Sequence, residues 1–199
     1  MAVSLRTFDN TTFDKHAGLL KRTLWWYVNA VFFKSSFFPI MGFKKWLLIA
    51  FGAKVGNRLI IKPCVSIKFP WKLELGEDVW IGEQVWIDNL DQVIIGNNVC
   101  LSQGALLLTG NHDYTLSSFD FRNEPIILED GVWIGAKSVV CPGVRCKTHS
   151  ILTVGSVATA NLEPYSINQG SPAQCIRKRI FKDEPGSLTN SSPEPRFVS

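Results

Sequence analysis

A six-residue repeat constrains the fold of this 199-residue chain more than any other feature of its sequence. From Val55 onward the chain divides into units of six, with two short interruptions and one long one. Val, Ile or Leu fills thirteen of the fifteen first positions, whereas an ordinary β-rich domain alternates with a period of two and keeps no such phase. The first positions are Val55, Ile61, Ile67, Leu75, Ile81, Ile87, Ile95, Leu101, Leu107, Leu128, Ile134, Val140, Cys146, Leu152 and Ala158.

A period of six indicates a solenoid of short strands. Two or three extended residues form a strand at about 3.3 Å per residue, and the remaining residues turn a corner. Three such sides close a triangular coil, in which each first-position side chain points to the axis and stacks on the next coil. Glycines such as Gly82 and Gly135 follow the first position, where a small residue eases the corner. Each coil covers the edge of the previous one, so the solenoid needs caps at both ends.

Residues 51–180 resemble the hexapeptide-repeat acyltransferases, whose fold is a left-handed parallel β-helix. The segments FGAKVG, WIGEQVWIDNL, VCLSQGALLLTGNHDY and EDGVWIGAKSVVCPGV are most similar to exopolysaccharide acetyltransferases of the colanic-acid type, within the maltose and galactoside O-acetyltransferase group. The resemblance implies an acetyl-CoA-dependent enzyme without a metal, which acetylates a hydroxyl of a sugar or exopolysaccharide precursor. It also implies a homotrimer with active sites between subunits.

The long interruption is a candidate functional loop. Leu107 and Leu128 are 21 residues apart where six would continue the coil, so residues 109–125 are predicted to leave the solenoid. His112 lies at the root of this loop, where the resemblance implies the catalytic histidine. A neutral imidazole can accept the proton of a sugar hydroxyl as that hydroxyl attacks the thioester. The candidate acceptor-binding residues are Asp88, Asn89, Asn111, Asp113 and Tyr114, although Asn111 and Asp113 could instead orient the imidazole or cap the loop turn.

The resemblance also implies where acetyl-CoA binds. In such enzymes it lies along a groove between adjacent subunits, near the later coils, where small residues let the pantetheine approach the backbone. Arg177 and Lys178 could meet the CoA phosphates, while Ala160 and Gln174 replace a lysine and an arginine common in the family. The residues that match the groove are Trp133, Gly135, Ala136, Val154, Gly155 and Thr159.

The first quarter of the chain is basic and aromatic. Residues 1–50 contain seven Lys or Arg and two Asp or Glu, a net charge of +5, whereas the whole chain carries +4. Within residues 14–51, two helices are predicted from the spacing of apolar residues. They would either cap the first coil and cover a neighbouring subunit or lie on an anionic membrane surface. The apolar positions are Leu24, Trp25, Val28, Val31 and Phe32, then Phe43, Trp46, Leu47 and Ala50; the basic positions are Lys21, Arg22, Lys34, Lys44 and Lys45.

The predicted organisation is therefore a helical segment 1–52, a β-helix 53–171 with its loop 109–125, a short C-terminal helix 172–181 and a disordered tail 182–199. A net charge of +4 is too small to indicate nucleic acid binding. Signal peptide and membrane-spanning patterns are missing. The five cysteines form no CxxC pair, which favours reduced thiols in a cytoplasmic protein, with a peripheral position at the inner membrane surface as an option.

Three alternatives concern the function. The same fold serves serine and amino-sugar N-acetyltransferases, which differ in the acceptor, and a solenoid can also act as a non-catalytic scaffold subunit. A γ-class carbonic anhydrase needs three clustered zinc histidines, and His16, His112 and His149 are not spaced to supply them.

Overall fold

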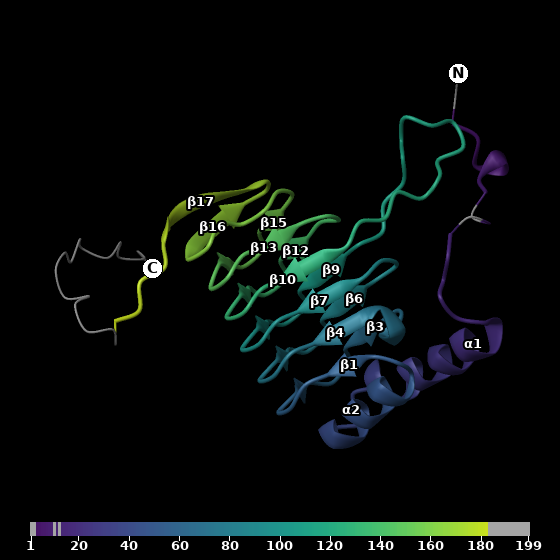
Figure 1. The fold of residues 1–199 in the computed structure, drawn as a ribbon, viewed down its shortest axis with the longest axis horizontal. Helices are drawn as coiled ribbons and strands as arrows, with labels where there is room; N and C mark the ends of the chain where they lie inside the picture. Colours follow the sequence, from purple (N-terminus) through teal and green to yellow (C-terminus); the bar gives the residue numbers. More distant parts are fainter. Residues whose placement is uncertain (1–2, 10, 12, 183–199) are drawn as a thin grey trace.

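The computed structural model describes residues 3–9, 11 and 13–182, and its main body is a triangular solenoid of about six coils (Figure 1). Its strands form three sheets, one for each side of the triangle. Sheet A contains β1 (Lys54–Val55), β4 (Leu73–Leu75), β7 (Val93–Ile95), β10 (Ile126–Leu128) and β13 (Arg145–Cys146). Sheet B contains β2 (Ile60–Ile61), β5 (Trp80–Ile81), β8 (Cys100–Leu101), β11 (Trp133–Ile134), β14 (Ile151–Leu152), β16 (Ser166–Gly170) and β17 (Ala173–Lys178). Sheet C contains β3 (Ser66–Ile67), β6 (Trp86–Asp88), β9 (Leu106–Leu108), β12 (Val139–Val140) and β15 (Val157–Ala158).

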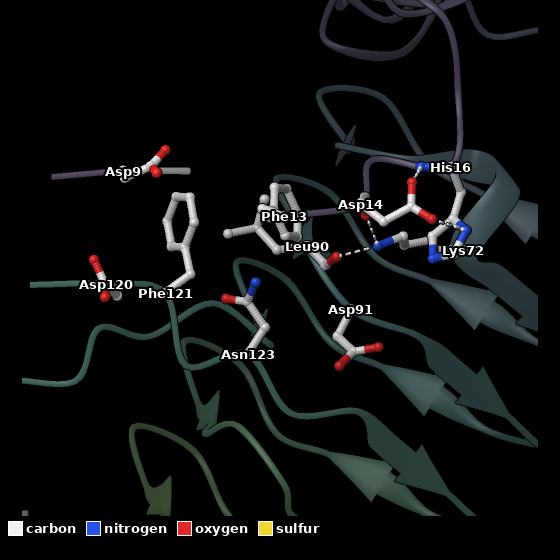
Figure 2. A pocket seen from close by; sticks show the side chains of 10 residues that line it. All are labelled: Asp9, Phe13, Asp14, His16, Lys72, Leu90, Asp91, Asp120, Phe121 and Asn123. Atoms are coloured by element: carbon white, nitrogen blue, oxygen red, sulfur yellow. Dashed lines mark hydrogen bonds and ion pairs between the residues drawn. The ribbon is translucent and has the colours of Figure 1, made fainter. Parts of the chain in front are cut away.

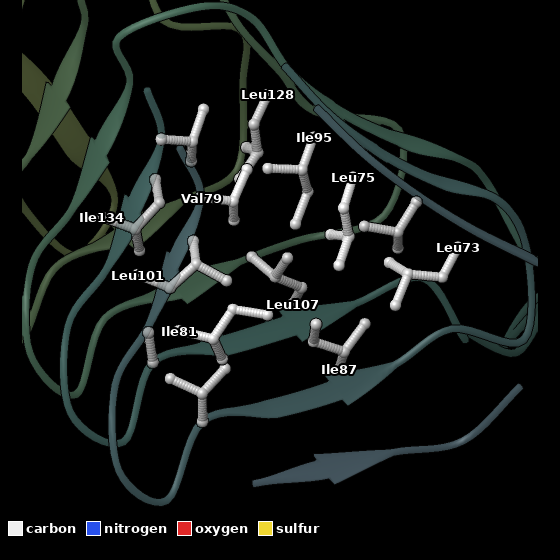
Figure 3. Packing of buried hydrophobic residues seen from close by; sticks show 14 of the residues in the cluster. Leu73, Leu75, Val79, Ile81, Ile87, Ile95, Leu101, Leu107, Leu128 and Ile134 are labelled. Carbon is white, nitrogen blue, oxygen red and sulfur yellow. The ribbon is translucent and has the colours of Figure 1, made fainter. Parts of the chain in front are cut away.

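The core is a stack of the repeated aliphatic residues along the solenoid axis. Each strand up to β16 pairs in parallel with the strand one coil away, so that Ile61 lies opposite Ile81 and Ile81 opposite Leu101. Fourteen of the fifteen predicted first positions are buried, and Val55 in the first coil is half-buried. Figure 3 shows these side chains in contact inside the triangle. The parallel β-helix predicted from the six-residue period is confirmed.

Adjacent coils approach so closely that some corners admit only glycine. A Cβ built on Gly135 would lie 2.6 Å from the backbone nitrogen of Val154 in the next coil. Any side chain there would push the two coils apart and weaken the hydrogen bond that Gly135 N donates to Leu152 O at 2.7 Å.

Two helices close the N-terminal end of the solenoid, beside β1 (Figure 1). Trp25 and Leu48 are buried at this end, and Trp25 Nε1 donates a 2.9 Å hydrogen bond to the carbonyl oxygen of Ile67. This cap covers the apolar edge that the first coil would otherwise expose to solvent. The helical elements are the 3-10 helix η1 (Leu5–Thr7), α1 (Leu19–Val28), the π-helical turn η2 (Asn29–Phe33), α2 (Met41–Ala50) and the 3-10 helix η3 (Pro70–Lys72). Among the described residues, no helix has the length and apolar content needed to cross a bilayer.

The buried face of α2 differs from the predicted one. Lys44, Leu47 and Leu48 point into the cap, whereas Trp46 is exposed. The prediction of Lys44 as a surface cation is therefore wrong. Lys21 also contacts the solenoid, because its ammonium lies 4.9 Å from the centre of the Trp71 ring.

The C-terminal end is closed by a strand, so the helix predicted for residues 172–181 is wrong. β17 runs antiparallel to β16, with Gln169 opposite Gln174 and Gly170 opposite Ala173. β16 is the last strand of the parallel stack, and its free edge carries unpaired backbone groups that β17 satisfies. Helix-forming residues such as Gln174 and Lys178 adopt an extended conformation because this edge offers them ladder hydrogen bonds. The predicted tail falls on 183–199, outside the described residues, apart from Lys182.

The three sheets differ in their outer faces. Sheet A carries Lys54, Glu74 and Arg145 there, with Ile94 and Ile127 between Glu74 and Arg145. Sheets B and C instead carry aromatic and aliphatic ladders. Trp80, Cys100, Trp133 and Ile151 follow one another on sheet B, and Trp86, Leu106, Val139 and Val157 on sheet C.

Candidate functional site

The extruded loop comprises residues 109–125, between β9 and β10, and leaves the solenoid at the corner from sheet C to sheet A. The loop is a short irregular hairpin, in which His112 lies opposite Phe121. Asp113 N donates to Asp120 O at 2.8 Å, and Arg122 N donates to Asn111 O at 2.8 Å. These two hydrogen bonds flank His112 in the hairpin and fix its backbone.

The imidazole of His112 is oriented by the same loop. Its Nδ1 lies 2.6 Å from the carbonyl oxygen of Phe119. A carbonyl can only accept, so Nδ1 carries the proton in the neutral ring, and Nε2 keeps its lone pair for a substrate. The ring stacks on Phe119 at 4.3 Å between centroids and contacts Phe121 and Phe8 at 4.9 and 5.7 Å. A single tautomer in an aromatic enclosure suits a general base.

A cavity of about 400 Å³ lies beside this histidine. Of the predicted site residues, it brings together His112, Asn111 and Asp88. Asp88 is 8% exposed, and its carboxylate is paired with the ammonium of Lys68 at 2.9 Å. The cavity therefore has polar groups that could orient a hydroxylated ligand against Nε2.

The other predicted acceptor residues do not reach this cavity. Asn89 is fully buried and spans two coils, because its amide accepts from Phe69 N at 2.9 Å and donates to Phe69 O and Lys72 O. Its predicted role in acceptor binding is replaced by a structural one. Asp113 caps the loop turn by accepting from the backbone nitrogen of Thr115 at 2.9 Å and from its hydroxyl. These hydrogen bonds lower the pKa of the Asp113 carboxyl. Tyr114 is exposed on the loop.

The N-terminal strap, residues 13–17 together with Phe8, completes the site and was missed in the sequence. Phe13 packs on Phe121 at 5.2 Å and lines the cavity beside His112. The strap is held to the solenoid by Trp71, whose Nε1 donates to Lys15 O at 2.8 Å. Figure 1 shows this segment beside the extruded loop. The sequence of the strap has no hydrophobic periodicity, so its position beside His112 follows only from the long-range contacts in the structure.

A neighbouring cavity of about 320 Å³ is lined by four aspartates, Asp9, Asp14, Asp91 and Asp120 (Figure 2). Lys72 crosses its wall, and its ammonium donates to the carbonyl oxygens of Leu90 and Asp14 at 2.7 and 3.0 Å. His16 is paired with Asp14 at 3.0 Å. These contacts join the strap to the solenoid and serve the structure.

The predicted cofactor residues mostly share a different corner. Gly135 and Ala136 follow β11, and Val154 and Gly155 follow β14, so all four lie at the corner from sheet B to sheet C. Gly155 N donates to Ala136 O at 2.9 Å, which stacks the two turns. Trp133 on sheet B leads into this corner, and its Nε1 donates to Ser102 Oγ at 2.9 Å. Within one chain, the corner from sheet B to sheet C and His112 lie at opposite edges of sheet C.

The remaining predicted cofactor residues are exposed elsewhere. Thr159 lies beyond β15, at the corner from sheet C to sheet A, two coils after the loop. Arg177 and Lys178 are exposed on β17. Arg179 instead packs inward, and its guanidinium donates to Gly131 O and His149 O.

The thiols are poor candidates for an acyl-carrying nucleophile. All five cysteines are free, and burial raises the pKa of Cys100 and Cys141 and that of Cys146 to about 12. A raised pKa leaves little thiolate at neutral pH. Across the described part of the chain, no three His, Cys, Asp or Glu side chains are grouped to hold a metal ion.

Comparisons with known proteins identify relatives of this chain and structures with a similar fold. No family model matches the chain. The colanic acid biosynthesis acetyltransferase WcaF of Escherichia coli strain K12 is 34% identical over 161 residues, which cover 81% of this chain and 88% of that protein. The galactoside O-acetyltransferase of the same strain is 27% identical over 135 residues, 66% of each chain. Among solved structures, a hexapeptide-repeat acetyltransferase of Vibrio cholerae complexed with acetyl-coenzyme A has a TM-score of 0.74 at 20% identity, covering 87% of this chain and 93% of that one.

Proposed function

Because the chain belongs to the hexapeptide-repeat acetyltransferases with a left-handed β-helix, we propose that it transfers the acetyl group of acetyl-CoA to a hydroxyl of a sugar or exopolysaccharide precursor. The observation that carries this proposal is His112, whose Nδ1 is fixed at the root of the extruded loop and whose side chain lines a cavity together with Asn111 and Asp88.

In the proposed reaction, His112 Nε2 accepts the proton of the acceptor hydroxyl while the hydroxyl oxygen bonds to the acetyl carbon. The C–S bond of the thioester then breaks, and the imidazolium returns the proton to the CoA thiolate. Phe119 O stabilises the imidazolium through the Nδ1 hydrogen bond, which becomes charge-assisted. The aromatic residues around the ring exclude water, which would otherwise compete as the acceptor.

The corner from sheet B to sheet C fits acetyl-CoA as the co-substrate. Val154 is 70% exposed, and nothing lies within 4 Å of a Cβ built on Gly155. A thioester arm can therefore reach the backbone there without meeting a large side chain. This corner lies away from His112 in one chain, which supports a trimer whose subunits share each site. The apolar outer faces of sheets B and C support the same assembly.

We also propose a cytoplasmic location with peripheral contact to the membrane. Free thiols suit a reducing compartment. The capping helices and the segment between them expose large apolar side chains that could enter a lipid interface, namely Leu20, Trp26, Phe37 and Trp46.

The proposed activity is tested by CoA thiol release from acetyl-CoA with a panel of free sugars, nucleotide sugars, lipid-linked saccharides, serine and amino sugars. We expect a hydroxylated saccharide to be the best acceptor, and His112→Ala to lower kcat by about 10²–10⁴-fold. His149→Ala, a histidine at the corner from sheet A to sheet B and outside the cavity beside His112, is the matched control and should keep its rate. A His112→Ala rate within a few-fold of wild type would refute the assignment of the base. Acetylation of serine or an amine alone would favour the N-acetyltransferase alternative, and no release with any acceptor would favour the scaffold.

A further inference from the structure

A second cavity extends the site toward the capping helices. It has a volume of about 650 Å³ and lies between α1 and η2 on one side and sheet C on the other. Its wall shares Lys68, Phe69 and Asp88 with the cavity beside His112. The two cavities therefore adjoin, and a ligand longer than one sugar could occupy both. We call this second cavity the helical groove.

The helical groove is positively charged. Arg22, Lys34 and Lys68 line it, and Asp88 is its one carboxylate, so its formal charge is three minus one, or +2. Asp88 is already paired with Lys68. Arg22 and Lys34 form no ion pair with any described residue, so their charges are available to a ligand.

Arg22 gives the strongest indication of a ligand. Its Nε is buried and has no hydrogen-bond acceptor within the described part of the chain. A buried donor without a partner is costly, and a guanidinium is the side chain that best fits the oxygens of a phosphate. Arg22 also lines the helical groove, so a phosphate there would give its guanidinium the acceptors that it lacks among the described residues.

The walls of the helical groove also suit a saccharide. Trp26 and Trp86 line it with exposed indole rings, and Phe69 stands where the two cavities meet. Such rings offer flat apolar faces against which a sugar ring can pack.

Resting on the proposed acetyltransferase function, we propose that the acceptor is a glycosyl phosphate or diphosphate. The sugar hydroxyl lies at His112, and the phosphate lies in the helical groove against Arg22 and Lys34. Nucleoside and polyprenyl diphosphate sugars present the same anion, so either can supply the anomeric phosphate.

The test compares one sugar in four forms: galactose, galactose 1-phosphate, UDP-galactose and undecaprenyl-diphosphate-linked galactose, with glucose and N-acetylglucosamine series in parallel. We expect at least tenfold higher kcat/KM for a phosphate-linked form than for the free sugar. Arg22→Met and Lys34→Met should each lower that value tenfold or more while the KM for acetyl-CoA stays unchanged. Lys54→Met, a lysine on the outer face of sheet A, is the control. The preferred diphosphate ester then identifies the source, nucleotide or lipid.

Binding is measured separately, so that failure of the acceptor panel does not leave the groove untested. Inorganic pyrophosphate should change the tryptophan fluorescence of the full chain saturably, and Lys34→Met, at an exposed position, should weaken this binding at least tenfold without affecting folding. The proposal is overturned if free and phosphate-linked sugars react equally, or if the variants raise the KM for acetyl-CoA instead. If no sugar reacts at all, the proposed function fails, and the pyrophosphate titration alone decides on the groove: saturable binding lost in Lys34→Met retains it, and its absence rejects it.

Discussion

Lys44 is an ammonium group enclosed in the cap between α2 and the first coil. Its side chain is fully buried, its Nζ donates to Lys62 O at 3.5 Å, and the centre of the Phe33 ring is 5.9 Å from Nζ. Desolvation lowers the pKa of this lysine from its ordinary 10.5. A lowered pKa means that the unfolded chain binds more protons than the folded one, so this residue opposes folding at neutral pH, and its penalty fades as the pH rises toward 10.5.

Lys44→Met should therefore stabilise the protein. Methionine is also unbranched, is one atom shorter and removes the buried charge, so we expect a gain of about 1 kcal/mol at pH 7. The gain should shrink as the pH rises toward 10.5, because the folded lysine, whose pKa is lowered, loses its proton before the unfolded one does and the buried charge disappears. Urea unfolding of both proteins from pH 7 to 10 measures this difference. Lys45→Met, at the adjacent partly exposed position, is the control and should show no such pH dependence. A less stable Lys44→Met at pH 7 would contradict the prediction.

The residues of the site were predictable only where a motif marked them. His112 stands out because it follows the break in the repeat, and Asp88 because it belongs to the segment WIGEQVWIDNL that carries the resemblance. Phe8, Phe13 and Lys68 were missed, since their roles depend on contacts across more than forty residues or across coils. Asn89 was misassigned because a buried amide that bridges two backbones and one that binds a sugar look alike in a sequence.

Among the elements, the strands and the two N-terminal helices were predicted, whereas the buried face of α2 and the C-terminal strand were not. A strand of the solenoid is fixed by its own hexapeptide and by identical neighbours, so the local pattern and the packing agree. The α2 helix and β17 are instead oriented by what they cover. The uncovered core of the first coil favours an orientation of α2 that buries Leu47 and Leu48. The free edge of β16 favours an extended partner strand. Such tertiary effects override helical periodicity and propensity.

The capping helices should bind a lipid surface through their exposed apolar residues. Leu20 and Phe37 are 83% and 93% exposed, and Lys34 adds a cation that anionic lipids would attract. In flotation with vesicles of phosphatidylethanolamine and phosphatidylglycerol, we expect the intact protein to float, and Leu20→Glu with Phe37→Glu to reduce the bound fraction at least fivefold. Ile180→Glu, an exposed apolar position near the opposite end, is the control. Wild-type protein that stays at the bottom of the gradient would refute membrane contact and leave subunit packing as the role of this face.

At the scale of the whole molecule, the separation of His112 from the corner of Val154 and Gly155 bears on assembly. The two lie at opposite edges of sheet C, and the outer faces of sheets B and C are apolar. A closed ring of three chains would bury these faces and bring the histidine edge of one subunit to the open corner of the next. In a single chain His112 and the open corner stay apart, so the proposed reaction requires the assembly of three chains.

Shared sites can be tested by mixing two inactive chains. His112→Ala removes the base, and Val154→Trp obstructs the open corner, whereas Val154→Ala is the control that should remain active. The two defective chains are co-expressed in equal amounts. A site is intact when a chain that keeps His112 lies next to a chain that keeps Val154. Random mixing produces this arrangement in about one quarter of the sites. We therefore expect the purified mixed trimer, captured through two different affinity tags, to recover about a quarter or more of the wild-type rate, although each parent is inactive. Sedimentation should give three chains for every variant. A mixed assembly as inactive as its parents would show that one chain supplies the whole site, and would contradict the sharing of sites between subunits.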